Sequence, residues 1–376
     1  MTRHAVETLR LVQFRSHARC AIDCGGRSVL VVGANGAGKT NLLEAVSMLS
    51  PGRGLRGAPP EALARQPGPG GWKVEAEISG PAGRHAVASW ARPGQGRQVA
   101  VDGKAVAQLA LAERLTVLWL TPAMDRLWAE GAADRRRFLD RVAMSFHPAH
   151  AAATIRYEKA MRERNRLLRE DVRDAAWYLA LEAQMADAAG TITANRRDAI
   201  ARLMAAQADA ATAFPRAELE LLAPEQSGAA GGDLAALLAE GRARDRAAGR
   251  TLAGPHRADL RAVFAEKGTE AQLCSTGEQK ALLISLILAN ARALAAMPGG
   301  AVPVLLLDEV AAHLDRERRA ALHEEVAALG AQAWMTGTDA ALFADFIAPA
   351  LRLRAEEGPQ GSRLAPAEGC GAAVTR

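Results

Sequence analysis

Hydrophobic positions along the first third of the chain predict a mixed α/β region. Residues 29–32 form an apolar run that stops at a glycine loop, as a buried parallel strand does. Apolar positions at helical spacing predict a helix over residues 41–49, and the glycine-rich and proline-rich residues 51–71 indicate a loop. Apolar and polar positions then alternate in residues 72–78, 85–90 and 97–101. Because the hairpin-turn signal Asp102-Gly103 ends this series, we expect an antiparallel sheet.

The middle of the chain has a helical pattern instead. Residues 135–213 are rich in Ala, Arg, Glu and Leu and carry apolar positions at helical spacing, which predicts a helical insert. Residues 223–250 are a weaker return segment. The elements predicted after it are strands over 301–307 and 332–336 and helices over 278–294 and 316–329. We expect residues 358–376 to be a frayed tail.

Composition and charge restrict the class of protein. A chain of 376 residues can bury a substantial core and divide into two lobes. Because we find neither an apolar run of roughly 20 residues nor a secretory signal, we expect a cytoplasmic protein without a membrane partner. The net charge of +5 and pI near 9.3 permit nucleic-acid binding without establishing it. The cysteines are expected to be reduced and structural: Cys20, Cys24, Cys274 and Cys370.

A glycine-rich loop carries the clearest candidate chemistry. Gly33–Thr40 matches G-x-x-x-x-G-K-[ST], with a predicted strand before it and a predicted helix after it. In this phosphate loop, or P-loop, backbone N–H groups surround the phosphates of ATP or GTP. Lys39 would bridge the β- and γ-phosphates as a catalytic residue, and the Thr40 hydroxyl would hold Mg²⁺. The predicted nucleotide contacts are Gly33, Ala34, Asn35, Gly36, Ala37, Gly38, Lys39, Thr40 and Asn41.

An acidic pair follows a second buried strand almost three hundred residues later. Val304–Leu307 is an apolar run that ends in Asp308 and Glu309. Asp308 fits the Walker B position that holds Mg²⁺, and Glu309 fits the base that activates the attacking water.

A third motif lies about thirty residues before this pair. Ser275-Thr276-Gly277-Glu278-Gln279 opens an apolar helix, with Ser275 able to cap it and Gly277 allowing close approach of an anion. The three motifs occur in the order P-loop, S-x-G-[EQ] and Walker B. With this order of motifs, the sequence resembles the ABC-type ATPases. In those proteins this signature covers the γ-phosphate on the P-loop of a second subunit, and Asp315 matches the D-loop at that contact. The resemblance implies an ATP-dependent homodimer with two composite sites.

Two parts of the ABC-type pattern are absent. The switch position after the last strand, usually histidine, is Thr338, and residues 117–122 contain no Q-loop glutamine. We therefore expect slow turnover.

Further motifs distinguish among the ABC-type ATPases. The insert is far too short for an SMC-type coiled coil. The alternative function is that of another compact ABC-type ATPase, such as a transporter ATP-binding subunit. The sequence resembles the RecF family of bacterial recombination mediators over nearly its whole length, although Ala123 and residues 130–132 depart from it. The resembling stretches are residues 9–17 with Phe14-Arg15, the P-loop, residues 135–140, residues 157–168, residues 251–260, the signature and residues 305–315. Gly254-Pro255-His256-Arg257 is the most specific of them.

The resemblance implies a fold and a domain order. The expected fold class is α/β, an ABC-type ATPase head with a mixed P-loop sheet and an antiparallel subsheet, interrupted by a mainly helical lobe. We expect the N-terminal part of the head over residues 1–133 and the helical lobe over 134–250. The C-terminal part of the head, with signature and Walker B, would be residues 251–360, and a flexible tail would be 361–376.

The resemblance also implies a function. A homodimer closed by ATP and Mg²⁺ would clamp DNA at gaps or junctions between single-stranded and duplex DNA, and hydrolysis would release it. Such a protein aids recombinase loading, supports replication-fork recovery and the SOS response, and works with RecR and RecO. The ATPase would be weak, stimulated by DNA, and would act as a switch.

Arginines are the candidate DNA contacts, since phosphate contacts carry little sequence preference. The alternative is that these arginines form intramolecular ion pairs or a solvated helix face. The candidates are Arg53, Arg56, Arg135, Arg136, Arg137, Arg162, Arg164 and Arg166. We expect His256 and Arg257 to brace the fold, and Trp119 and Trp128 to be core residues.

Overall fold

The computed structural model describes residues 2–208, 210–222, 233–358 and 361–367. The chain divides into two compact units. Unit 1 comprises residues 1–125, 210–214 and 283–376, and unit 2 comprises residues 126–209 and 215–282. Unit 2 therefore continues beyond the helical segment expected at 134–250, as far as Leu282.

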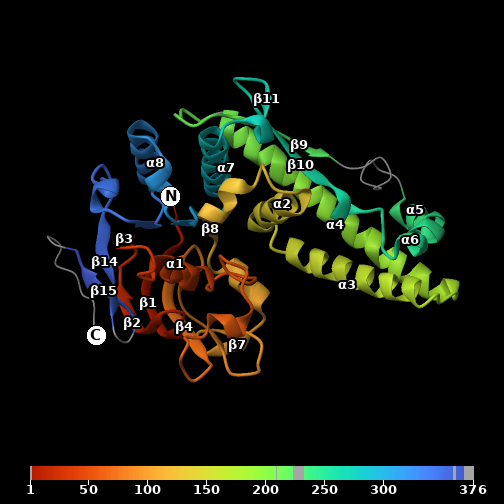
Figure 1. The fold of residues 1–376 in the computed structure, drawn as a ribbon, viewed down its shortest axis with the longest axis horizontal. Coiled ribbons are helices and arrows are strands. Elements are labelled where there is room, and N and C mark those ends of the chain that lie inside the picture. The colour runs from red at the N-terminus through yellow and green to blue at the C-terminus, as the bar shows by residue number, and fades with distance from the viewer. Residues whose placement is uncertain (1, 209, 223–232, 359–360, 368–376) are drawn as a thin grey trace. The chain divides into compact units, whose positions relative to one another are not determined.

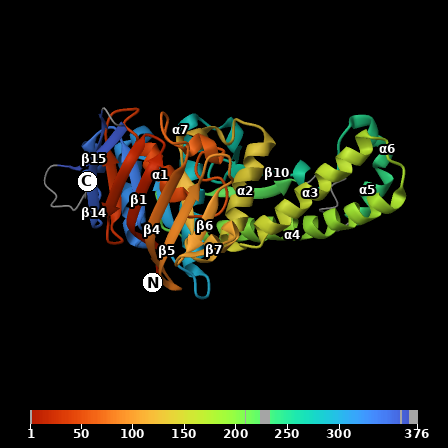
Figure 2. The same cartoon turned by 90° about the horizontal axis from the view of Figure 1, so that it is seen from below.

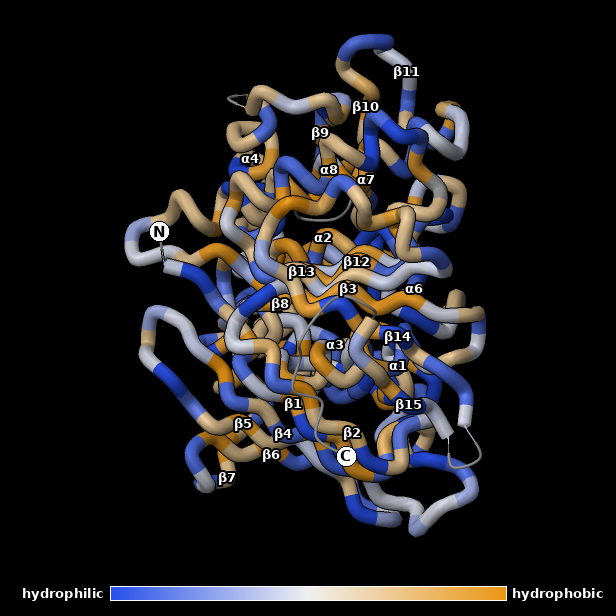
Figure 3. The backbone as a smooth tube through the Cα atoms, turned by 90° about the vertical axis from the view of Figure 1, so that its left-hand side faces the viewer, coloured by the Kyte–Doolittle hydropathy of each residue, from blue (hydrophilic) through white to orange (hydrophobic). Residues whose placement is uncertain are grey.

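A mainly parallel sheet forms the centre of unit 1. Its strands, in spatial order, are β15 (Gly361–Pro366), β14 (Ala350–Gly358), β3 (Ser28–Val32), β13 (Ala333–Gly337), β12 (Val304–Leu307) and β8 (Val117–Leu120). Neighbouring strands from β14 to β8 are parallel, and β15 is antiparallel to β14. Every residue of β3, β8, β12 and β13 is buried, and Figure 3 shows these strands as a largely hydrophobic band. Such continuous apolar runs are typical of parallel strands covered on both faces.

An antiparallel sheet forms the second layer of unit 1. Its strands, in spatial order, are β2 (His17–Asp23), β1 (Ala5–Phe14), β4 (Trp72–Gly80), β5 (Gly83–Ala91), β6 (Gln98–Val101) and β7 (Lys104–Val106). Figure 2 shows β1, β4, β5 and β6 side by side in this order. Asp102 and Gly103 connect β6 to β7 with φ of 49° and 77°, the left-handed pair that a tight hairpin needs. The predicted hairpin and antiparallel sheet are therefore confirmed.

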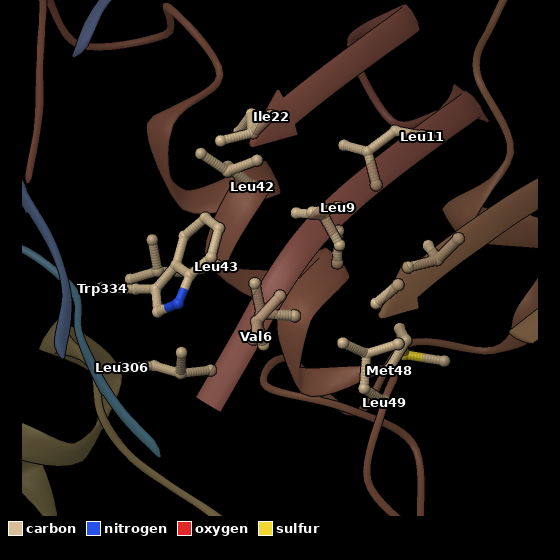
Figure 4. Close-up of a cluster of buried hydrophobic side chains, with 14 of the residues drawn as sticks. Val6, Leu9, Leu11, Ile22, Leu42, Leu43, Met48, Leu49, Leu306 and Trp334 are labelled. Carbon is tan, nitrogen blue, oxygen red and sulfur yellow. The ribbon is translucent and has the colours of Figure 1, made fainter. Parts of the chain in front are cut away.

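Helix α1 (Lys39–Ser47) packs in the core that the two sheets share. Figure 4 shows side chains from both layers converging on Leu42 and Leu43 of this helix. Val6 and Leu9 come from β1, and Trp334 comes from β13. Because α1 begins at the glycine loop, the position of that loop is fixed by the main hydrophobic core.

Two further helices lie in the last third of the chain. Helix α7 (Thr276–Ala296) precedes β12, and α8 (Arg316–Leu329) connects β12 to β13. Helix α7 is long and apolar enough to cross a membrane by length and composition, but 78% of its most apolar stretch is buried inside the protein. That burial is what a core helix shows.

Unit 2 is built around a long helical hairpin. Helices α3 (His150–Arg169) and α4 (Ala175–Ala208) lie side by side in Figure 1. Small residues such as Ala153 and Ala160 on α3 and Ala188 on α4 are buried in their shared core. The remaining elements of unit 2 are α2 (Ala132–Phe146), α5 (Leu234–Glu240), α6 (Arg242–Ala248) and a sheet of β9 (Ala217–Leu222), β10 (Asp259–Phe264) and β11 (Thr269–Glu270). The helical insert expected at 135–213 is present, and the small sheet was not predicted.

The C-terminal segment differs from the expected tail. Gly361–Pro366 form strand β15, which pairs with β14 along its full length. The backbone N–H of Ser362 also donates to the carbonyl of Ser16. The expectation of a tail is therefore wrong for Gly358, which ends β14, and for Gly361–Pro366, while residues 368–376 lie outside the described residues.

Candidate nucleotide-binding site

The glycine loop connects the end of β3 to the start of α1. Gly38, the residue before the helix, has φ of 91°, and a Cβ atom there would lie 2.2 Å from Oγ of Ser362. Both the backbone conformation and the close approach therefore require glycine. Lys39 is 3% exposed, and its Nζ donates hydrogen bonds to the carbonyls of Gly33 at 2.8 Å and Ala34 at 2.9 Å. The loop thus encloses the ammonium group of Lys39.

The acidic pair predicted from sequence lies beside this loop. The hydroxyl of Thr40 donates to the carboxylate of Asp308, at 2.9 Å from Oδ1 and 3.0 Å from Oδ2. Asp308 is 4% exposed, and burial raises the pKa of its carboxyl, while hydrogen bonds from Thr336 and Thr40 oppose that rise. A desolvated carboxylate next to a hydroxyl is a site at which a bound cation would be stabilising.

Glu309 follows in a left-handed backbone conformation, with φ of 53°. Its carboxylate lies 3.5 Å from Nζ of Lys39 and its side chain is 28% exposed. The structure therefore brings the lysine of the glycine loop and both acids together at the carboxyl edge of the parallel sheet, the edge at which ligands bind in open α/β sheets.

Sequence reasoning missed one residue of this group. Thr336, near the end of β13, donates to Oδ1 of Asp308 at 2.7 Å and accepts a hydrogen bond from the backbone N–H of Glu309 at 2.9 Å. Thr338, the residue at the expected switch position, is exposed. Strand 332–336 was predicted, but the order of the strands in the sheet could not be. The contact between Thr336 and Asp308 could therefore not be predicted from the sequence.

A second missed contact ties the loop to neighbouring strands. Asn41 donates through Nδ2 to Oγ of Ser16 at 2.8 Å, and Oγ of Ser362 lies 2.7 Å from the same atom. Arg56, in the loop after α1, donates to Oδ1 of Asn41 at 2.9 Å and pairs with the buried Glu44 at 3.4 Å. The start of α1 is therefore linked through Ser16 to the turn between β1 and β2, and through Ser362 to strand β15.

The signature residues belong to unit 2. Ser275 and Glu278 form a capping box at the start of α7: the Ser275 N–H donates to Glu278 at 2.8 Å, and the Glu278 N–H donates to the Ser275 hydroxyl at 3.4 Å. An ion pair with Lys267, together with Ser275, lowers the pKa of Glu278 to about 2. Gln279 donates to the carbonyl of Cys274 at 2.9 Å, whereas Ser275 and Gly277 are exposed. The motif thus presents a capped helix start on the surface of its unit.

Asp315 also caps a helix. Its side chain accepts from the backbone N–H of Arg318 at 2.8 Å, where α8 begins in unit 1.

Comparison with known proteins agrees with this geometry. The family model described as RecF/RecN/SMC N terminal domain matches residues 5–345. A protein of Mesorhizobium japonicum called DNA replication and repair protein RecF is 47% identical over 371 residues, which cover 95% of this chain and 97% of that protein. The chain belongs to the RecF family. A second RecF, from Rhizobium meliloti, is 47% identical over 347 residues, covering 89% of this chain and 92% of that protein.

Solved structures of RecF and of an Smc head domain confirm the fold class. A structure described as the recombination mediator protein RecF with ATPrS has a TM-score of 0.81 at 20% identity, covering 94% of this chain and 96% of that one. An Smc head domain from Pyrococcus furiosus has a TM-score of 0.56 at 14% identity, covering 96% of each chain. The α/β head with an inserted helical lobe is therefore the fold of this RecF-family chain.

Several arginines that were candidate DNA contacts of this RecF-family chain are held inside unit 2. Arg164 is 0% exposed and pairs with Glu182 at 3.0 Å and Asp245 at 2.6 Å, so the expectation that it touches DNA is wrong. Arg135 forms a two-pronged ion pair with Asp259, both bonds at 2.8 Å, and Arg136 donates to the carbonyl of Ala258. The exposed candidates are Arg53, Arg56, Arg137, Arg162 and Arg166, of which Arg56 is 43% exposed.

The most specific motif of the RecF resemblance braces unit 2. Nδ1 of His256 lies 2.7 Å from the hydroxyl of Tyr157 on α3. Gly254 has φ of 127°, and a Cβ atom there would lie 2.1 Å from the same hydroxyl. The structural role expected for His256 is therefore confirmed, whereas Arg257, for which the same role was expected, is exposed. Trp119 and Trp128 are both buried, as expected for core residues.

Of the four cysteines, three lie among the described residues. Cys20, Cys24 and Cys274 are free thiols, and Cys370 lies outside the described residues. Burial raises the pKa of Cys20 and Cys24 to about 12, which keeps both thiols protonated and unreactive.

Proposed function

We propose that this protein is an ATP-dependent DNA-binding protein of recombinational repair and replication-fork recovery. The observation that carries the proposal is the pair of contacts that joins the P-loop to the acidic pair. Thr40 hydrogen-bonds to Asp308, and Lys39 lies 3.5 Å from Glu309. These residue types at this separation suit nucleotide binding with hydrolysis, and the RecF relatives supply the class of process.

Mg²⁺ fits the residues present. Thr40 and Asp308 offer a hydroxyl and a buried carboxylate, the hard oxygen donors that Mg²⁺ prefers. Among the described residues no group of three or more His, Cys, Asp or Glu side chains could hold a metal. A cation bound through one or two protein oxygens and the phosphates of a nucleotide matches that donor set. When bound, Mg²⁺ would neutralise negative charge on the phosphates.

The remaining roles follow from geometry and charge. Lys39, enclosed by the loop carbonyls, would turn to the β- and γ-phosphates of ATP. Glu309, partly exposed at the same edge of the sheet, would orient the attacking water and accept its proton. Hydrolysis would be slow, because Thr338 cannot replace the imidazole of a switch histidine.

The signature supports a dimeric switch. Ser275 and Gly277 are exposed at a helix start, which is suited to a phosphate bound by another subunit. Two heads would close around two ATP molecules and clamp DNA at gaps, and hydrolysis would release the clamp. The protein would act in the cytoplasm with RecR and RecO, aid recombinase loading and support the SOS response.

The experiment that tests this proposal measures ATP hydrolysis by the purified protein with and without gapped DNA. We expect slow hydrolysis that gapped DNA stimulates and that Lys39→Ala abolishes, together with loss of ATP binding in that variant. Hydrolysis that is indifferent to DNA would contradict the clamp. ATP binding that is unchanged in Lys39→Ala would contradict the nucleotide site itself.

A further inference from the structure

Thr336 lies on the strand between the two strands that lead into the P-loop and into the acidic pair. Strand β13 lies between β3, which leads into the P-loop, and β12, which leads into the acidic pair. In the register of these strands, Met335 lies beside Leu307 and Thr336 lies beside Val31. Thr336 therefore reaches the level of Asp308 at the sheet edge where Lys39 and Glu309 also lie.

One hydroxyl group contacts both members of the acidic pair. Thr336 donates its proton to Oδ1 of Asp308 at 2.7 Å, and its oxygen accepts from the N–H of Glu309 at 2.9 Å. A hydroxyl has one proton to donate and lone pairs to accept, so the two bonds are compatible. The first bond fixes the side chain of Asp308, and the second fixes the backbone of Glu309 in its left-handed conformation.

The group that makes these bonds has little freedom to move. Thr336 is 1% exposed and lies in a strand that is paired on both sides. Its branched Cβ atom restricts rotation about χ1. The hydroxyl thus stays aimed at the acids, whereas the second donor to Asp308, Thr40, is itself a proposed Mg²⁺ ligand and would be drawn to the cation.

We propose that Thr336 is a positioning residue for nucleotide hydrolysis. Its hydroxyl holds the Asp308 carboxylate in place for Mg²⁺ and the Glu309 backbone in place for water activation, so that both acids move as one unit. This inference rests on the proposed nucleotide site. It assigns to Thr336 a contact with the acids that the exposed Thr338, two residues later, does not make.

The test compares two substitutions at this position with a matched control. Thr336→Val keeps the size and the β-branch but removes the hydroxyl, and Thr336→Ser keeps the hydroxyl. Ser28→Ala is the control, because Ser28 is 4% exposed and accepts from the N–H of Ala333 at 3.0 Å, at the opposite end of β13. The valine variant leaves the backbone N–H of Glu309 without its side-chain acceptor, and the alanine variant does the same to the backbone N–H of Ala333.

Three quantities are measured on the full chain: the affinity for a fluorescent ATP analogue in EDTA, the same affinity in Mg²⁺, and kcat at saturating ATP. In Thr336→Val we expect the EDTA affinity to stay within about twofold of the Ser28→Ala value. We expect the gain in affinity on adding Mg²⁺, and kcat, each to fall by about tenfold or more, because a hydrogen bond to a charged group is lost. Thr336→Ser should restore both. Thermal unfolding of all variants distinguishes these losses from global destabilisation.

Two results would overturn the inference. One is a Thr336→Val protein whose Mg²⁺-dependent gain and kcat equal those of Ser28→Ala. The other is a Thr336→Val protein that loses affinity equally in EDTA and in Mg²⁺, or a Thr336→Ser protein that does not regain the lost function. Either outcome would make the role of Thr336 structural. If the unaltered protein itself shows no Mg²⁺-dependent binding or hydrolysis of ATP, the proposed function fails, and that failure is separate from any difference among the variants.

Discussion

The hydroxyl of Thr40 donates a hydrogen bond to the carboxylate of Asp308, at 2.9 Å from Oδ1, across 268 residues of sequence. The bond joins the first turn of α1 to the end of β12. Thr40 and Asp308 come together because β3 and β12 both end at the carboxyl edge of one parallel sheet. The contact links two motifs that are widely separated in sequence.

Asp308→Asn should separate stability from nucleotide binding. Burial raises the pKa of Asp308, because the carboxylate loses solvation when the protein folds, and asparagine would not carry this desolvation cost. We expect asparagine to raise the free energy of unfolding without nucleotide by about 1 kcal/mol and to abolish Mg²⁺-dependent ATP binding. Urea unfolding and binding of a fluorescent ATP analogue measure the two effects. Lower stability with intact Mg²⁺-dependent binding would contradict both assignments.

Arg164 should prove to be a structural residue. Its guanidinium pairs with Glu182 and Asp245 and also donates to Oγ1 of Thr251 at 2.9 Å. Arg164→Leu leaves two buried carboxylates with fewer partners, so we expect the variant to lose about 3–5 kcal/mol of unfolding free energy. Denaturant unfolding, with hydrogen exchange in α3 and α4, measures the loss.

Arg162→Leu is the matched control for this prediction. Arg162 is on the same helix and is 66% exposed, so its substitution should change the unfolding free energy by no more than about 0.5 kcal/mol. An Arg164→Leu protein with unchanged stability but weakened DNA binding would contradict the structural role and would make Arg164 a DNA contact.

Sequence was informative where neighbours in the chain decide the structure. The P-loop, the two acids after β12 and the hairpin turn at Asp102-Gly103 are each set by a few consecutive residues. The antiparallel sheet and the helical lobe were predicted for the same reason, since their periodicity is local.

Sequence was less informative where distant parts of the chain decide the structure. The partners of Arg164 lie 18 and 81 residues away, so its burial could not be distinguished from a solvated helix face. Thr336 contacts Asp308 only because β13 inserts between β3 and β12. Gly361–Pro366 is short and has no alternating pattern, and pairing with β14 makes it a strand.

Acid should destabilise the protein through His323. This side chain is buried beside the rings of Phe343 and Phe346, and neither ring nitrogen has a hydrogen-bond partner among the described residues. Burial, with a smaller contribution from Arg319, lowers the pKa of His323 from 6.5 to about 4. The unfolded chain therefore binds a proton more readily, so stability falls as the pH drops from 6.5 towards 4 and this contribution levels off below 4.

His323→Leu tests that relationship. At pH 4 the histidine should cost about 3 kcal/mol relative to neutral pH, and the leucine variant should lose that part of the pH dependence. Other histidines whose pKa is lowered by desolvation leave some slope in both proteins: His4, His17 and His256. Urea unfolding at pH values between 4 and 7 measures the difference, and parallel curves for the two proteins would contradict the assignment to His323.

The dimeric switch is tested most directly by Glu309→Gln. Glutamine keeps the shape of the side chain but cannot accept a proton from water, so ATP should bind without being hydrolysed. Sedimentation with ATP, Mg²⁺ and gapped DNA measures the assembly. We predict a stable dimer that stays on the DNA, whereas the unaltered protein dissociates as ATP is consumed. A Glu309→Gln protein that remains monomeric with ATP and Mg²⁺ would contradict the composite site and the clamp.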